Sequence, residues 1–366
     1  MDQTWIWESS NWPNFNVDNQ RVMTHLTDAI RTVSPLVELA RRLTDAQRAN
    51  FESLVVLDEA LSTSFIEKEV LDRDSVRSSI ARHLGLPDAK FGDKRYETFT
   101  KVYFESIRTA QQNLTAETLK EWHEKLFIEK PVLREVTIGD YRNDEMSVVS
   151  GHFGRKEVVH FKAPCSDKNC VQQEMNQFFE WLNEDHNASY IRAAIAKFWF
   201  VTIHPFDDGN GRLSRIIAER CLAEADETDM RLYSISTEIE KRKSEYYELL
   251  ESHQKGSGDL TDWVVWFLDR VQDAAKKSMA RLDKVLLATQ FWDRHRETQF
   301  NERQRKLLIR LLETTDFEKG IARRKYKNLV STSDATAARD LLSLVEMGIL
   351  KSEGKGRSVK YFIEPL

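Results

Sequence analysis

HPFDDGNGRLSR, residues 204–215, decides how the rest of this chain is interpreted. It follows YIRAAIAKFWFVTI (190–203), which is apolar on nearly every side and therefore predicts a helix in the middle of a bundle. Apolar residues from Leu213 to Cys221 then resume a helical spacing. The quoted stretch is thus a polar connection between two helices, and we expect the chemistry of the protein there.

The predicted loop Gly209-Asn210-Gly211 lies at the start of the second helix. Free backbone N–H groups and the helix dipole favour an anion at such a position. Arg212 and Arg215 are three residues apart, so their side chains share a helix face and add two positive charges. This combination predicts a site for a polyphosphate rather than for a single phosphate.

Two further side chains complete the predicted site. Asp208 would be repelled by phosphates unless it holds a Mg²⁺ ion that bridges phosphate oxygens. His204 ends the buried helix, and an imidazole with an ordinary pKa of about 6.5 can accept a proton at neutral pH. Taken singly, these residues could be a helix cap, a turn and solvated arginines; their combination within one short stretch favours the functional interpretation.

This stretch resembles the signature HPFx[D/E]GNGRxxR of the Fic family, with every specified position filled. Three further segments resemble bacterial members that carry a C-terminal winged helix: GDYR (139–142), the hairpin near 152–162 and SISTEIEKRKSEYYELLE (234–251). The resemblance implies a mainly α protein: a Fic helical bundle with a β-hairpin flap, followed by a small winged helix-turn-helix domain. The flap would hold a target segment by strand addition.

The resemblance also implies an activity and a role for each residue of the site. The enzyme would move AMP from ATP onto a Ser, Thr or Tyr hydroxyl of a target protein, or of itself, and would expel pyrophosphate. His204 would act as the general base, and Asp208 would bind Mg²⁺. Asn210 and the backbone of Gly209 and Gly211 would contact the α- and β-phosphates. Arg212 and Arg215 would contact the β- and γ-phosphates.

A second motif predicts autoinhibition. Residues 63–67, TSFIE, resemble the family's inhibitory pattern [S/T]xxxE[G/N], in which the Glu pairs with the second Arg and blocks the γ-phosphate. Glu67 is therefore the expected inhibitory residue, on a helix predicted over about 49–70. Lys68 departs from the Gly or Asn of the pattern, and Lys closes a helix in the left-handed conformation less easily. A solvated Glu on an amphipathic helix is the alternative interpretation.

The rest of the chain is interpreted outward from these motifs. We expect an aromatic-rich arm and helix at 1–48, the catalytic domain at 49–270, a linker helix at 271–300 and the winged helix domain at 301–366. Tyr141 to Pro164 predicts the hairpin. The tryptophans of the arm indicate that it packs onto the body, and they leave room for a homodimer.

Residues 301–366 hold 14 Lys or Arg and 9 Asp or Glu, a net charge of +5. The expected recognition helix, Ala335 to Met347, is flanked or occupied by Asp334, Asp340 and Glu346 but carries only one basic residue, Arg339. DNA binding and docking of another protein or subunit therefore both stay open for this domain.

Composition narrows the class of protein. The chain has 366 residues, 41% of them hydrophobic and 31% charged, with no apolar run long enough for a membrane span and no secretory signal. We therefore expect a cytoplasmic protein without membrane association. Three cysteines, Cys165, Cys170 and Cys221, suit a reducing compartment without a disulfide framework, and a zinc site at the first two lacks further ligands.

Two alternative functions remain at this stage. The protein could be a DNA-binding regulator whose nucleotide domain turns over little. It could also be a Fic enzyme that uses UTP, GTP or a phosphocholine nucleotide, because the motif contacts phosphates and leaves the base to other residues.

Overall fold

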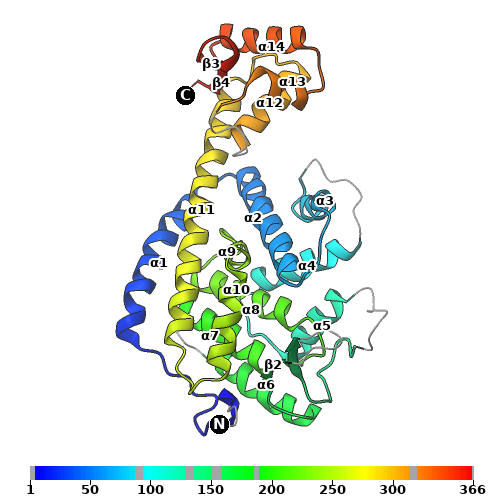
Figure 1. The fold of residues 1–366 in the computed structure, drawn as a ribbon, viewed down its shortest axis with the longest axis vertical. Coiled ribbons are helices and arrows are strands. Elements are labelled where there is room, and N and C mark those ends of the chain that lie inside the picture. The colour runs from blue at the N-terminus through cyan, green and yellow to red at the C-terminus, as the bar shows by residue number, and fades with distance from the viewer. Residues whose placement is uncertain are drawn as a thin grey trace. The chain divides into compact units, whose positions relative to one another are not determined.

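Helices make up most of the chain, as its few glycines and prolines predict (Figure 1). The computed structural model describes residues 5–86, 94–127, 136–150, 158–184, 189–313 and 320–364. The chain divides into two units, Met1–Ser278 and Met279–Leu366. Among the described residues, no helix combines the length and the apolar character that crossing a membrane demands.

The first unit contains a short 3-10 helix, ten α-helices that end within it among the described residues, and one hairpin. Their bounds are η1 (Ile6–Glu8), α1 (Asn19–Ala40), α2 (Asp45–Ile66), α3 (Arg73–His83), α4 (Lys94–Arg108), α5 (Ala116–Leu126), β1 (Ser147–Ser150), β2 (Val158–Lys162), α6 (Lys168–Asn183), α7 (Tyr190–Ile203), α8 (Asn210–Ala225), α9 (Ile235–Lys241) and α10 (Lys243–Gln254). A long helix, α11 (Thr261–Arg294), includes the boundary between the two units.

The helix α7 has the predicted bounds and forms the centre of the first unit. Ser189 caps its N-terminus, and almost all of its residues are buried. Its Trp199 ring packs edge-on against Phe178 of α6 and Phe15 of the N-terminal arm. Fully burying one large apolar side chain contributes roughly 1.5–3 kcal/mol, so this helix anchors the loop that follows it.

The helix α2 differs from its predicted range of 49–70 at both ends. Thr44 caps it in a reciprocal capping box with Gln47, so it begins earlier than the apolar pattern indicated. It ends at Ile66, and Lys68, two residues later, takes a left-handed conformation (φ 65°). The Glu69 and Lys68 amides donate to the carbonyls of Ser64 and Phe65, which closes the helix as a Gly or Asn would.

The aromatic residues of the N-terminal arm pack onto the first unit, as predicted. The Trp5 ring meets Phe161 of β2 edge-on, with their centroids 5.6 Å apart. The Trp7 indole donates to the Lys162 carbonyl, and the Trp12 indole donates to Glu174. The arm is therefore fixed both by apolar burial and by the polar atoms of its indoles.

The predicted hairpin consists of antiparallel strands β1 and β2. Val148 pairs with Phe161 and Val149 pairs with Val159, which leaves His160 as an extra residue in a β-bulge. The strands lie in the predicted range Tyr141 to Pro164, while Gly151 and Gly154 lie outside the described residues. Phe161 is buried and so fixes the hairpin on the body of the unit.

The second unit has the predicted order of helices followed by two strands. Its elements are α12 (Glu302–Glu313), α13 (Arg323–Leu329), α14 (Asp334–Glu346), β3 (Leu350–Glu353), η2 (Gly356–Ser358) and β4 (Lys360–Ile363). The strands pair antiparallel, and Ile321 adds a bridge to Tyr361. A core that includes Leu307, Leu341 and Tyr326 belongs to this unit alone. The helix predicted at Ala335 to Met347 is confirmed as α14.

Candidate active site

A cavity of about 680 Å³ lies where α7 meets α8. Its lining includes the predicted site residues His204, Asp208, Gly209, Asn210, Gly211 and Arg215, together with Glu67, the residue that follows α2. Residues of the hairpin and of α10 form its other walls. The structure thus brings the two sequence motifs, more than 100 residues apart, to one cavity.

His204 ends α7 with a left-handed backbone (φ 52°, ψ 59°). Its Nδ1 atom lies 3.1 Å from the Val201 carbonyl, which only accepts, so Nδ1 carries the proton. Burial is the main cause that lowers the pKa of His204 to about 4, against the opposing effect of the Val201 carbonyl. The imidazole is therefore neutral near pH 7, with the lone pair of Nε2 ready to accept a proton.

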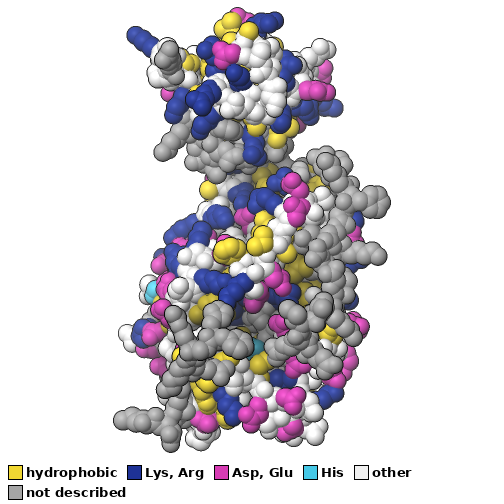
Figure 2. All heavy atoms as spheres, turned by 45° about the vertical axis from the view of Figure 1, so that its right-hand side comes forward, with side chains coloured by type: hydrophobic (Ala, Val, Ile, Leu, Met, Phe, Trp, Pro, Cys, Tyr) yellow, Lys and Arg dark blue, Asp and Glu magenta, His cyan; other side chains and the backbone are white. Residues whose placement is uncertain are grey.

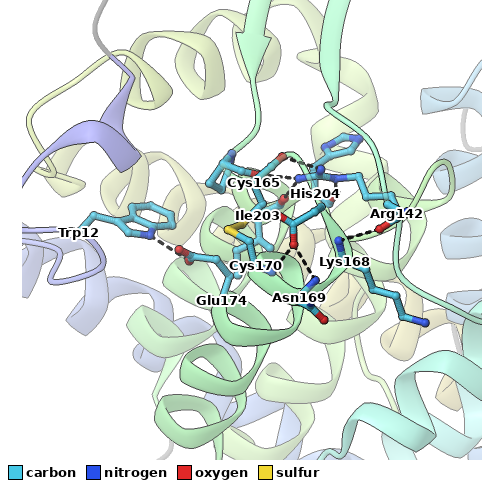
Figure 3. The surroundings of a disulfide bond; sticks show 12 residues. Trp12, Arg142, Cys165, Lys168, Asn169, Cys170, Glu174, Ile203 and His204 are labelled. Carbon is cyan, nitrogen blue, oxygen red and sulfur yellow. Dashed lines mark hydrogen bonds between the residues drawn. A yellow bond between two sulfur atoms is a disulfide. The ribbon is translucent and has the colours of Figure 1, made fainter.

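Arg142, the last residue of GDYR, holds the backbone that carries His204 (Figure 3). Its Nε donates to the His204 carbonyl at 2.8 Å, and its terminal nitrogens donate to the carbonyls of Ile203, Pro164 and Cys165. The side chain is only 1% exposed. Five directed donors on one rigid guanidinium can fix several loop carbonyls at once, which Lys could not do. The GDYR motif predicted a resemblance but no role for Arg142.

Side chains behind the loop 205–209 set its shape. Asn210 closes it, accepting from the Phe206 amide at 3.0 Å and donating to the Phe206 carbonyl at 2.7 Å. The Phe206 ring stacks on His123 of α5 with their centroids 4.0 Å apart. His123 in turn donates to the Asp208 carbonyl and accepts from the Gly139 amide. The Asn210 side chain therefore shapes the loop; its predicted phosphate contact stays a prediction.

Gly209 and Gly211 must both be glycines, because other side chains lie too close for a Cβ atom at either position. Gly209 has φ 80°, and a Cβ there would lie 2.8 Å from the Phe127 ring. A Cβ at Gly211 would collide with the Glu67 carboxylate. That carboxylate therefore lies against the N-terminal turn of α8, the position at which a helix favours an anion.

Asp208 offers one carboxylate oxygen for a cation. Its Oδ1 accepts from the Gly209 amide at 2.6 Å, while the exposed side chain lines the cavity. Mg²⁺ is commonly held by one or two carboxylates together with the oxygens of a bound phosphate substrate. A single exposed carboxylate beside an anion site fits that coordination. Within the described residues, no cluster of three or more His, Cys, Asp or Glu provides an all-protein metal site.

Glu67 and Arg215 form an ion pair of 2.5 Å inside the cavity. Arg215 also donates to the hydroxyl of Thr63, at 2.6 Å, and to its carbonyl. Burial alone would raise the pKa of Glu67, but the charge and the hydrogen bond of Arg215 lower it below its usual value. The pairing of the motif glutamate with the second arginine is thus present, and the alternative of a solvated Glu67 is wrong.

Arg212 is less closely bound than Arg215. Its guanidinium lies 4.9 Å from the centre of the Phe127 ring and 3.5 Å from an oxygen of Glu69, whose side chain is half-exposed. The Arg212 side chain itself is largely buried, so the exposed end of this ion pair is the Glu69 carboxylate. Glu69 was not predicted, and only its position just after the inhibitory motif could have drawn attention to it.

Two lysines near the cavity were also missed. Lys197 of α7 is fully buried, and its Nζ donates to the Tyr246 hydroxyl at 2.8 Å. Burial and the nearby Arg215 lower its pKa far below the usual value. Lys243 donates to the Ile66 carbonyl at 2.6 Å and thus binds the C-terminal end of α2. Lys197 could have been noticed in the sequence as the one lysine of an otherwise apolar helix. No sequence pattern indicated a role for Lys243.

The cysteine prediction needs one correction. Cys165 and Cys170 form a disulfide bond, so the prediction of three unpaired cysteines is wrong for these two (Figure 3). They can pair because the chain turns back between them as α6 begins, with their Cα atoms 5.4 Å apart. Cys221 is free and buried.

Two family models match parts of the chain. Residues 113–222 match the Fic/DOC family, and residues 5–86 match a domain of unknown function, DUF4172. The Fic/DOC match contains the loop with His204 and most of α8. The DUF4172 match contains α2 and Glu67.

Curated relatives match over a short segment. The chain is 34% identical over 98 residues to the protein adenylyltransferase Fic of Drosophila virilis, a segment that is 26% of this chain and 19% of the relative. It is 33% identical over 98 residues to the protein of the same name from Drosophila melanogaster, 26% of this chain and 18% of the relative. The matched segment thus spans about a fifth of these relatives.

Solved structures match the fold over more of the chain. A Fic family protein from Desulfovibrio desulfuricans has a TM-score of 0.53 and 17% identity, covering 96% of this chain and 98% of that one. Fic-1 from C. elegans has a TM-score of 0.50 and 17% identity, covering 72% and 75%. The predicted mainly helical fold with a hairpin is confirmed.

Proposed function

Because residues 113–222 form a Fic/DOC-family domain, we propose that this protein transfers AMP from ATP to a hydroxyl of a target protein and that Glu67 inhibits the transfer. One observation carries the proposal. A neutral imidazole with a free Nε2 lines the same cavity as an anion site formed by the α8 N-terminus and Arg215. That arrangement supports proton removal next to a bound polyphosphate.

The proposed reaction uses the side chains as follows. Nε2 of His204 takes the proton of a Ser, Thr or Tyr hydroxyl as its oxygen attacks the α-phosphorus of ATP. The bond from the α-phosphorus to the bridging oxygen of the β-phosphate breaks, and pyrophosphate leaves. The N-terminal amides of α8, with Arg212 and Arg215, stabilise the negative charge on the phosphates. The hairpin β1–β2 supports the target segment at the cavity wall.

Asp208 would hold a Mg²⁺ ion in this reaction. When bound, the ion supplies positive charge that neutralises the phosphate oxygens of the nucleotide. Asp208 is fixed for this role by the Gly209 amide, which holds one of its oxygens. Its backbone is fixed by His123 through the Asp208 carbonyl.

Inhibition follows from competition for one position. The Glu67 carboxylate lies against Gly211 at the start of α8 and pairs with Arg215, where the terminal phosphate of a nucleotide would need the same charges. Two anions cannot share that site without repulsion. We therefore propose that ATP binds productively only after Glu67 leaves Arg215.

The experiment compares Glu67→Gly with the unchanged protein. Each is incubated with ATP and Mg²⁺, and its intact mass, or that of co-incubated cell proteins, is measured for added AMP. A charge-assisted hydrogen bond contributes roughly 1.5–3 kcal/mol, so transfer should rise by about 10- to 100-fold. Glu69→Gln removes the charge of a neighbouring exposed glutamate that pairs with Arg212 and not with Arg215, and it should change transfer by less than about threefold. An equal rate in the Glu67 variant and the unchanged protein would refute autoinhibition.

His204→Ala tests the transfer itself. Loss of a general base typically lowers a rate by about 10²- to 10⁴-fold, so AMP should be absent from co-incubated target proteins with this variant, even when Glu67 is also replaced. UTP, GTP and a phosphocholine nucleotide are offered in parallel to identify the donor. If none of them modifies a protein in the Glu67→Gly background, the proposed function is wrong.

A further inference from the structure

A serine, a histidine and a glutamate form a hydrogen-bonded chain at the edge of the cavity. Ser150 Oγ lies 2.5 Å from Nε2 of His160, and Nδ1 of His160 lies 2.8 Å from Oε2 of Glu251. Ser150 ends β1, His160 lies in β2, and Glu251 belongs to α10. None of the three belongs to the sequence motifs used above for phosphate or proton chemistry.

The direction of the hydrogen bonds follows from the carboxylate. Burial opposes ionisation of Glu251, but hydrogen bonds from Lys255 and His160 lower its pKa below the usual value, so it is ionised and only accepts. Nδ1 of His160 must therefore donate to it. In the neutral imidazole Nε2 then has a free lone pair, which accepts the Ser150 hydroxyl proton.

Local structure fixes this arrangement from each side. His160 is the extra residue of the β-bulge, and a bulge changes the direction in which a strand side chain points. Ser150 pairs with Val158, two residues from His160, so both side chains lie on one face of the hairpin. Glu251 is held through its second oxygen by Lys255, the residue that follows α10. The imidazole is thus oriented by a carboxylate that is itself oriented.

A hydroxyl hydrogen-bonded to an imidazole that a carboxylate orients is the usual arrangement of an activated nucleophile. Ser150 is exposed, whereas His160 and Glu251 line the cavity. The serine is therefore one imidazole ring away from the cavity in which the proposed function puts the α-phosphate of a nucleotide. That phosphorus is the electrophile this nucleophile would meet.

We propose that Ser150 is an acceptor for AMP in this protein, with His160 as its general base; this rests on the proposed function. Oγ of Ser150 forms a bond to the α-phosphorus of ATP while the bond to the bridging oxygen breaks. Pyrophosphate leaves with the electron pair, and the hydroxyl proton passes to Nε2 of His160. The product is a phosphodiester between Ser150 and AMP, at the strand that supports the target.

The test maps AMP on the Glu67→Gly protein after incubation with ATP and Mg²⁺, using peptide mass spectrometry. AMP is expected on Ser150, and it should be lost from this position in Ser150→Ala. The matched control is Ser252→Ala, since Ser252 is also exposed and lies 3.3 Å from an imidazole. That contact is with Nδ1 of His253, which donates to the Leu249 carbonyl and cannot take a proton. The Ser252 variant should therefore keep AMP on Ser150.

Variants of the other two residues separate activation from folding. His160→Ala should lower the rate at Ser150 by about 10²-fold or more. Glu251→Gln keeps an oxygen that can accept from Nδ1, so the rate at Ser150 should fall less than in Glu251→Ala. Thermal melting confirms that each variant is folded.

Three results would overturn the proposal. AMP on other residues with Ser150 unmodified would refute it and leave the proposed function intact. An unchanged rate at Ser150 in a folded His160→Ala protein would refute the role of the histidine. Absence of AMP from every peptide and every added protein would overturn both this proposal and the proposed function.

Discussion

The protonation of His204 depends on burial and on one backbone carbonyl. The left-handed backbone at this residue turns the ring so that Nδ1 meets the Val201 carbonyl at 3.1 Å. Burial penalises the charged imidazole and lowers the pKa to about 4. A histidine with this pKa is neutral near pH 7, and so keeps its accepting nitrogen.

This predicts the behaviour of His204 in a pH titration. Between about pH 5.5 and 8 its ring signals in an NMR spectrum should stay constant, and they should shift only as the pH falls toward about 4. The sign follows from burial: the folded state resists protonation, so the change comes below the ordinary value of about 6.5. The His204→Ala spectrum identifies the signals. A transition near pH 6.5 would show that the ring is solvated and would contradict the buried geometry.

The residues of the cavity could be predicted only where one motif contained them. His204 to Arg215 follow one another in the chain, so their types and spacing predicted a common site. Arg142 acts through carbonyls that other segments bring to it, and no local pattern predicts such contacts. Lys68 was expected to close α2 poorly, yet it adopts φ 65°, at a cost of about 1–2 kcal/mol for a residue with a Cβ. Contacts of α2 with the rest of the unit must offset that cost.

Three sets of contacts hold α2 and the residue that follows it against the cavity. Glu59 accepts from the Ser234 hydroxyl at 2.7 Å and from the Ser236 amide at the start of α9. Thr63 and Glu67 bind Arg215 of α8. Lys243 of α10 binds the last carbonyls of the helix. Glu67 is therefore held in place by contacts on several elements, and loosening any one of them should favour its departure.

Lys243→Met tests this cooperation. The change removes the donor to the Ile66 carbonyl while keeping most of the unbranched side chain, and one hydrogen bond contributes about 0.5–1.5 kcal/mol. Transfer of AMP in the presence of ATP and Mg²⁺ should therefore rise by roughly 2- to 10-fold, less than in Glu67→Gly. Lys241→Met is the control, because Lys241 is exposed and, among the described residues, its ion pair is with Glu238 of its own helix α9. Equal rates in the Lys243 variant and the control would mean that α2 does not depend on its C-terminal contact.

The helices were more predictable than their ends. Apolar spacing gave α7 its bounds because burial on all sides runs the full length of that helix. The start of α2 depends on the capping box of Thr44 and Gln47, which polar residues determine and an apolar pattern cannot show. Strand positions in the hairpin were predicted from β-branched residues, whereas the bulge at His160 depends on pairing between the strands.

The second unit is rich in basic residues, and these could bind an acidic partner. Lys and Arg side chains are prominent on the face of this unit that Figure 2 presents. The acidic residues of α14 were an argument against DNA binding, but Asp340 is buried and accepts two hydrogen bonds from Arg303. Asp334 lies 3.4 Å from Arg323. Two of the acidic side chains of α14 are therefore paired with arginines of the same unit. Their charge is then a weaker argument against binding of this unit to the phosphates of DNA.

We therefore expect the full chain to bind duplex DNA through this unit in a strongly salt-dependent manner. Each Lys or Arg that contacts a phosphate contributes about 0.9 to the slope of log affinity against log salt. Replacing the exposed Arg324, Lys355 and Lys360 by Ala should thus lower that slope by about 2 to 3, as measured by fluorescence anisotropy of a labelled duplex. Lys276→Ala, an exposed lysine of the first unit, should leave the slope unchanged. Absence of binding at low salt, or a slope that the triple substitution does not alter, would instead favour a protein or a second subunit as the partner, because such an interface depends less on released counterions.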